Sequence, residues 1–102
     1  MTDRTGYRKA LVARVLAGDG HASREQRAAA FANTGVAEPM RALIDKVANH
    51  ASEITDEDVA AAKATVPEDE IFELTVCAAV GRASRQLDSA LAALAAATKE
   101  PR

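Results

Sequence analysis

Apolar residues recur at helical spacing along most of the chain, and clusters of Gly, Pro, Asn, Ser and Thr separate these stretches. In the first stretch Tyr7, Leu11 and Val15 form a stripe, which ends at the turn Gly18-Asp19-Gly20. The pattern as a whole predicts five helices, over residues 7–17, 23–32, 39–51, 55–65 and 67–97. We therefore expect an all-α fold with a long C-terminal helix.

Residues at the predicted helix starts support this division. Ser23 and Gln26 have the spacing of a capping box, in which each side chain bonds the other residue's backbone. Thr55 is a good N-cap because three acidic residues follow it and suit the positive end of the helix dipole. Pro39 and Pro67 suit first helical positions, where the missing N–H costs no hydrogen bond.

The last predicted helix has two apolar faces. One face spans an arc of about 100° and is expected to face the core. Its members are Phe72, Val76, Val80, Ala83, Leu87, Ala90, Leu91 and Leu94. A second arc of Ile71, Leu74 and Ala78 is confined to the first half. We expect a neighbouring copy to cover this second arc, and Gly81 to mark a close helix approach across that interface.

Composition narrows the class of protein. The chain has 102 residues, which suits one domain over residues 1–102, and 25 of them are alanine, the best helix former. A single cysteine excludes an intrachain disulfide, and no apolar run is long enough to span a membrane. The net charge of -2 argues against general nucleic-acid binding. We expect a cytoplasmic protein with neither a nucleic-acid nor a membrane partner.

The charge is unevenly divided between the two halves. Residues 1–50 carry eight basic and five acidic side chains, whereas residues 51–102 carry five basic and ten acidic ones. Two ordinary solvated faces explain this division, and so does head-to-tail docking in an oligomer.

Residues 54–59 (ITDEDV) and 67–81 (PEDEIFELTVCAAVG) resemble the core of the carboxymuconolactone decarboxylase and AhpD-like alkylhydroperoxidase superfamily. The resemblance covers about residues 40–94 and is strongest over 54–94. It implies a small five-helix AhpD-like domain that assembles as a homo-oligomer of the trimer or hexamer class.

The redox residues of that family do not carry over. Its redox members place a proton-relay Glu, a Cys-x-x-Cys pair and a His on this helix, and the Glu matches Glu70. The two cysteine positions fall on Arg82 and Arg85, and the His position falls on Ser89. A dithiol peroxidase needs both thiols, so the resemblance implies a non-redox member.

Two groups of residues remain as candidates for a site. Glu70 is either a general base, as the resemblance implies, or a first-turn carboxylate favoured by the helix dipole. Arg82, Arg85 and Ser89 share one helix face and could clamp a small carboxylate. Alternatively, the two arginines are ordinary surface residues, or they pair with the acidic first turn of a neighbouring subunit.

The cysteine and the histidines suggest little chemistry. Cys77 lies in an apolar setting, so a packed core residue is favoured over a reactive thiol. His21 and His50 are far apart in sequence, and no further ligand stands at a metal-binding spacing. We expect neither a metal nor a cofactor.

Three functions remain open at this stage. The first is a non-redox oligomeric binding or accessory module with a protein or small carboxylate partner. The second is a decarboxylase or lyase that uses Glu70 as base and Arg82 or Arg85 to hold an acidic substrate. The third is a peroxidase that depends on Cys77. Whether the chain is an enzyme stays open.

Overall fold

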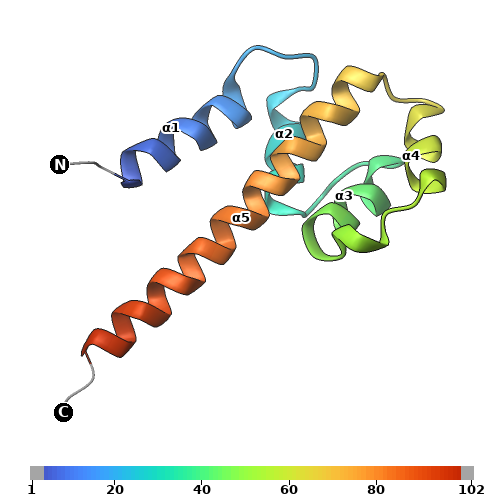
Figure 1. The fold of residues 1–102 in the computed structure, drawn as a ribbon. Coiled ribbons are helices and arrows are strands. Elements are labelled where there is room, and N and C mark those ends of the chain that lie inside the picture. Colours follow the sequence, from blue (N-terminus) through green and yellow to red (C-terminus); the bar gives the residue numbers. More distant parts are fainter. Residues whose placement is uncertain (1–3, 100–102) are drawn as a thin grey trace.

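Residues 4–99 fold into five α-helices, which confirms the predicted all-α class (Figure 1). The computed structural model describes the backbone of residues 4–99 and the side chains of residues 6–98, so the ends of the predicted domain, 1–3 and 100–102, lie outside it. The helices are α1 (Arg4–Ala17), α2 (Arg24–Ala32), α3 (Met40–Asn49), α4 (Asp56–Lys63) and α5 (Glu68–Lys99). A 3-10 turn, η1 (Ala51–Glu53), lies between α3 and α4.

Helix α5 determines the shape of the molecule. Its first half packs with α2, α3 and α4, and its second half extends away from them (Figure 1). The principal extents are 58 × 29 × 20 Å, and the radius of gyration is 16.0 Å. A compact domain of this length has a radius of gyration of about 13 Å. The excess reflects the protruding part of α5, residues 87–98, which we call the arm.

The helix starts follow local capping chemistry. The Ser23 hydroxyl accepts a hydrogen bond from the backbone N–H of Gln26 at 3.1 Å. The Thr55 hydroxyl accepts from the N–H of Asp58, whose carboxylate accepts in return from the N–H of Thr55. Ser23 and Thr55 are thus confirmed as N-caps, but Ser23 and Gln26 form only one of the two bonds of the predicted capping box, whereas Thr55 and Asp58 form both. Pro39 precedes α3 instead of being its first residue. These bonds satisfy donors that the first helical turn leaves free.

The core lies where α2 and α3 pack against α5. Helix α3 contributes Met40, Leu43, Ile44 and Ala48, and α2 contributes Ala30. Helix α5 contributes Ile71, Leu74, Cys77 and Ala78. The predicted second arc of the last helix is therefore buried by its own chain, and the argument that a neighbouring copy covers this flank is wrong.

The predicted main core face of α5 is also wrong, because most of it lies at the surface. Phe72 is 69% exposed, Leu87 44%, Leu91 49% and Leu94 60%, whereas Val76 and Val80 are half-buried. The side-chain size on the opposite face explains the difference. Small residues at Cys77, Ala78 and Gly81 let α2 approach closely, which larger side chains would prevent.

Gly81 marks the closest approach. A Cβ atom at this position would overlap the backbone carbonyl of Phe31, near the end of α2. The prediction of a close helix approach at Gly81 holds, but the neighbour is α2 of the same chain and not a second subunit.

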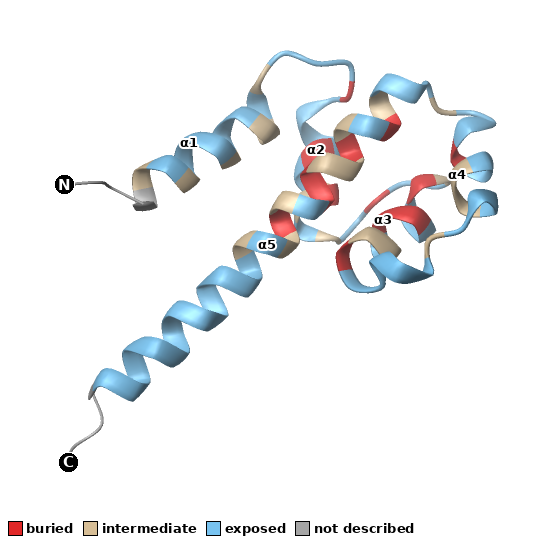
Figure 2. Ribbon diagram, in the orientation of Figure 1, coloured by how far each residue is buried: buried red, intermediate tan, exposed pale blue. Residues whose placement is uncertain are grey.

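The arm is exposed along its whole length (Figure 2). Every residue from Arg85 to Thr98 is exposed, including the leucines at 87, 91 and 94. Within residues 4–99, no helix combines the length and the apolar character that crossing a membrane requires. The arm is thus a helix whose apolar side is in contact with solvent.

Candidate functional site

Glu70 lies at an open hollow of about 340 Å³ between α2, α5 and the loop before α3. Apolar side chains, among them Val36, Met40 and Leu74, line part of this hollow. Two further carboxylates, Glu25 and Glu38, line it as well. Three carboxylates around one hollow disfavour an anionic ligand, because like charges repel.

Arg82, Arg85 and Ser89 line a second hollow of about 300 Å³, together with Ala48, Asn49 and Gln86. The structure thus brings together the three residues that share a face in the sequence. However, both guanidinium groups already have partners in the same chain. One nitrogen of Arg82 donates to the carbonyl of Ala48, and one of Arg85 donates to the carbonyl of Phe31 at 2.6 Å.

These two carbonyls lie in the last turns of α3 and α2. Carbonyl groups there have no partner within their own helix and carry the negative end of its dipole. Arg82 and Arg85 supply both a donor and a positive charge. Arg82 and Arg85 thus hold the ends of α3 and α2 against α5.

Glu70 and the two arginines do not share a site within one chain. They stand on the same helix, and Arg82 follows Glu70 by 12 positions. At about 1.5 Å per residue this places them roughly 18 Å apart along the axis. The two hollows have no lining residue in common. A small acid in one hollow is out of reach of the residues in the other.

Cys77 is a core residue, only 1% exposed. Its Sγ donates to the carbonyl of Val15 at 3.4 Å and so connects α5 with α1. Burial raises the pKa of the Cys77 thiol, the nearby Arg27 lowers it, and Glu73 raises it further. The net shift is upward, so the neutral thiol is favoured and the reactive thiolate is disfavoured.

Sequence reasoning missed a polar clamp on the loop between α1 and α2. The Glu73 carboxylate accepts from the backbone N–H groups of His21 and Ala22 at 2.9 Å. Buried Arg27 donates to the carbonyls of Ala22 at 3.0 Å and Gly18 at 2.6 Å. The clamp holds the loop against the start of α5.

The clamp also changes the titration of Glu73. Hydrogen bonds from the N–H groups of His21 and Ala22 lower the pKa of Glu73, because they favour its charged form. The sequence signal for this contact is Gly20, where a Cβ atom would overlap the Glu73 carboxylate. No local spacing connects residues 20 and 73, so the pairing was not predictable.

A second unpredicted contact joins α1 to the base of the arm. One guanidinium nitrogen of Arg8 lies 2.6 Å from the Asp88 carboxylate and 3.4 Å from the carbonyl of Ser84. Since Asp88 is largely exposed, this ion pair stabilises the fold only slightly. Its importance is geometric, because it sets α1 beside α5 where the arm begins.

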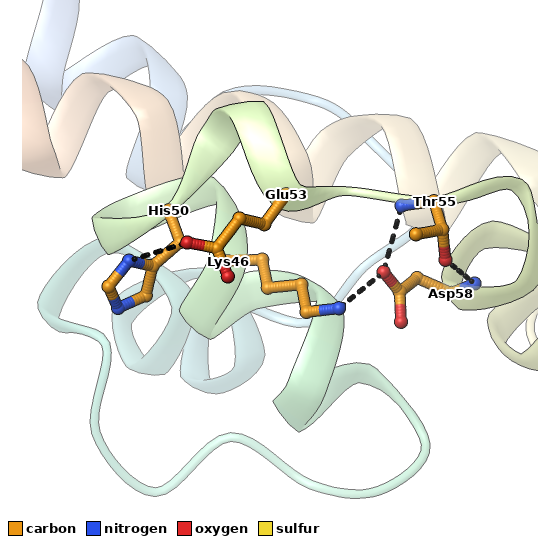
Figure 3. Close-up of polar contacts among 5 residues, drawn as sticks. All are labelled: Lys46, His50, Glu53, Thr55 and Asp58. Carbon is orange, nitrogen blue, oxygen red and sulfur yellow. Dashed lines mark hydrogen bonds and ion pairs between the residues drawn. The ribbon is translucent and has the colours of Figure 1, made fainter.

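The histidines take part in surface ion pairs. Nδ1 of His50, which follows α3, lies 3.5 Å from the carboxylate of Glu53, and both side chains are exposed (Figure 3). Nε2 of His21 lies 3.3 Å from the Asp69 carboxylate. In the part of the chain that the structure describes, no group of three His, Cys, Asp or Glu side chains is placed to hold a metal.

Lys46 and Asp58 form a polar contact between α3 and α4 (Figure 3). Nζ of Lys46 lies 2.8 Å from the same carboxylate oxygen that accepts from the N–H of Thr55. Both bonds lower the pKa of Asp58, the one from Lys46 most strongly. The cluster fixes the start of α4 and has no free group for chemistry.

Comparisons with known proteins give no family. A scan of protein-family models found no match, and searches of curated proteins and of solved structures found none. The function is therefore inferred from this chain's own geometry.

Proposed function

We propose that this chain is a non-redox helical interaction module, a binding or accessory protein whose working surface is the arm of α5 and the adjoining side of α1. The supporting observation is the position of its large exposed apolar side chains. They are Tyr7, Leu11, Phe72, Leu87, Leu91 and Leu94, each 44% to 72% exposed. All of them lie on α1 or α5. Large apolar side chains exposed on two neighbouring helices are typical of protein interaction sites.

The candidate chemistry supports a binding role over an enzymatic one. Cys77 is buried with a raised pKa, which disfavours a peroxidase. The lyase alternative needs Glu70 and an arginine to hold one substrate, but within a chain they line separate hollows. One guanidinium nitrogen each of Arg82 and Arg85 donates to a backbone carbonyl, which gives both residues a structural role.

Membership of the AhpD-like family and a trimeric or hexameric state stay predictions within this proposal. So does a cytoplasmic location, where a single unpaired cysteine is ordinary. The all-α fold with its long last helix is compatible with the family but is not specific to it.

Photocrosslinking in the producing cell tests the proposal. A photoreactive aromatic amino acid replaces Leu94 on the apolar side of the arm, and Ala92 on the other side serves as the matched control. Both positions are exposed. We expect protein crosslinks from position 94 and few from position 92. No crosslink from position 94, or equal yields at both positions, would contradict an arm that binds protein.

Peroxide turnover tests the non-redox part. With a dithiol reductant present, we expect the rate of peroxide consumption to equal that of the buffer. A protein-dependent rate that disappears in Cys77→Ala would restore the peroxidase hypothesis.

A further inference from the structure

Large and small apolar residues alternate along one side of α5. Val80, Leu87 and Leu94 stand seven residues apart, and an alanine follows each of them by three residues, at 83, 90 and 97. Steps of three and four residues place all six on one narrow stripe, which is the a and d spacing of a coiled coil. We call this stripe the arm seam. Val80 is half-buried and the other five residues are exposed.

The alternation fits an antiparallel pair of identical helices. When one helix is reversed against its copy, a positions lie opposite d positions. Leu87 then meets Ala90 of the second copy, Leu94 meets its Ala83, and Val80 meets its Ala97. Every layer pairs one large and one small residue, so all the layers can pack well at a single distance between the two helices. A parallel pair would set Leu against Leu and Ala against Ala, in alternately wide and narrow layers.

We propose that the arm seam binds the arm seam of a second copy of this chain, antiparallel and around a two-fold axis. The inference rests on the proposed function, since it names the partner of that surface. A two-fold contact uses the same patch on both subunits. It is compatible with the predicted hexamer, which can join three such pairs, but not with a closed trimer of single chains.

The available area suits a small contact. The seam from Val80 to Ala97 is about 27 Å long at about 1.5 Å per residue. Helix α1 widens its first half, because Arg8 holds α1 against Ser84 and Asp88, where the arm begins. The half beside α1 is about 20 Å across and the protruding half about 10 Å, which gives roughly 400 Å² per copy, or about 800 Å² in total. An area of this size is at the low end for protein interfaces, so we expect a weak and concentration-dependent pairing.

The exposed residues of α1 extend the same side of the molecule. Tyr7, Leu11 and Arg14 follow helical spacing on one side of α1. Arg14 lines a small hollow together with Phe72 and Val76, which begin the apolar side of α5. Tyr7, 72% exposed, and Leu11, 51% exposed, therefore continue this side toward the arm seam.

The charge pattern favours a second copy over a charged partner. From Ser89 to Thr98 the chain has no charged residue, although each of these residues is exposed. Solvent-facing sides of helices normally carry charges. This uncharged stretch offers no complement to an acidic or basic ligand. In the antiparallel register it lies opposite residues 79–88 of the second copy, whose seam positions Val80, Ala83 and Leu87 are apolar, so the seam sets no charge against it.

Sedimentation velocity of the purified full chain tests the pairing. Wild type is expected to form a dimer, or an even-numbered assembly such as a hexamer, at micromolar concentration. Leu87→Glu combined with Leu94→Glu is expected to weaken association more than tenfold. The matched control, Ala92→Glu with Ala96→Glu, places the same charges on the other side of the arm and should leave association unchanged.

Three results would overturn the inference: a wild-type monomer at all concentrations, a trimer, or equal loss of association in both double variants. The proposed function has a separate outcome. If the purified chain stays monomeric while position 94 crosslinks to a different protein in cells, self-pairing fails and the interaction module stands. If position 94 crosslinks to nothing, both fail.

Disulfide trapping tests the orientation in a Cys77→Ala background, under a mild oxidant. Chains carrying Val80→Cys and chains carrying Ala97→Cys are mixed. The antiparallel pair predicts disulfides between the two kinds of chain. It predicts none for Ala97→Cys alone, since its two cysteines would lie about 25 Å apart along the axis. A strong disulfide from Ala97→Cys alone would show a parallel pair and overturn the proposed register.

Discussion

The two halves of α5 contain similar residues but lie in different surroundings. The first half buries Ile71, Leu74, Cys77 and Ala78 against α2 and α3, whereas Leu91 and Leu94 in the second half face solvent. Hydrophobicity alone does not separate the buried from the exposed side, because both sides carry large apolar residues. The buried side is the one on which small residues let another helix approach closely. In an alanine-rich chain, the side with small residues can form the core and leave large residues on the other side for a partner.

The largest expected difference is between two leucines on this one helix. Leu74→Ala removes a side chain that is 4% exposed and should lower the free energy of unfolding by about 2–5 kcal/mol. Leu91→Ala removes the same atoms from the arm and should change it by less than about 0.5 kcal/mol in dilute solution. Urea unfolding followed by circular dichroism measures both. Similar losses would contradict the division of α5 into a core half and a free arm.

The close approach at Gly81 gives the next largest effect. Replacing a mid-helix glycine with alanine ordinarily stabilises a helix by about 1 kcal/mol. Here the added Cβ overlaps the Phe31 carbonyl, so Gly81→Ala should instead cost about 1–3 kcal/mol. The same unfolding measurement decides the sign. A stabilised variant would show that α2 does not pack against Gly81.

Removal of one arginine at the helix junction should have a smaller effect. Arg82→Met keeps most of the aliphatic stem but leaves the Ala48 carbonyl without its donor, which should cost about 1 kcal/mol. Arg24→Met, at the exposed start of α2, is the matched control and should cost less than about 0.5 kcal/mol. If Arg82→Met is as stable as wild type, the Arg82 guanidinium does not stabilise the fold. The hypothesis that Arg82 helps to bind an anion would then be favoured again.

The hydrogen bonds between Glu73 and the loop predict that the stability of the fold depends modestly on pH. Hydrogen bonds from the His21 and Ala22 backbone hold the folded pKa of Glu73 below its unfolded value. The resulting stability is complete above the unfolded pKa, about 4.3, and is lost as pH falls through the folded pKa. Melting temperatures from pH 7 to pH 3 should therefore fall more for wild type than for Glu73→Gln. Glu57→Gln, in the exposed first turn of α4, should follow wild type. If the melting temperatures of all three proteins fall equally with pH, the bonds of Glu73 to the loop do not stabilise the fold.

The fold was largely predictable because its determinants are local. Ser23 and Thr55 start their helices by capping bonds to residues three positions away, and Gly18 ends α1 within the same turn. Such signals involve neighbours in sequence, so a pattern of residues contains them. The all-α class, the five helices and the long last helix follow from these signals and from the alanine content.

Local sequence patterns could not predict which side of α5 is buried. They also could not predict whether the arginines of the candidate site have hydrogen-bond partners. Which side of a helix is buried depends on how closely α2 can approach, and that depends on residues far apart in sequence such as Phe31 and Gly81. The bonds of Arg82 and Arg85 to α3 and α2 are also long-range. Sequence spacing placed the arginines on one face correctly, but it could not show that one nitrogen of each is bonded to a backbone carbonyl of another helix.

Hydrogen exchange of the arm amides, residues 87–98, shows most directly whether the arm binds a second copy of the chain. A free helical arm opens easily, so its amides exchange quickly at every protein concentration. An arm paired with a second copy exchanges quickly when dilute and slowly when concentrated, while the buried half of α5 stays protected throughout. We predict this concentration-dependent protection at Leu87, Leu91 and Leu94. Fast exchange at these residues at all concentrations, in a folded protein, would contradict the account.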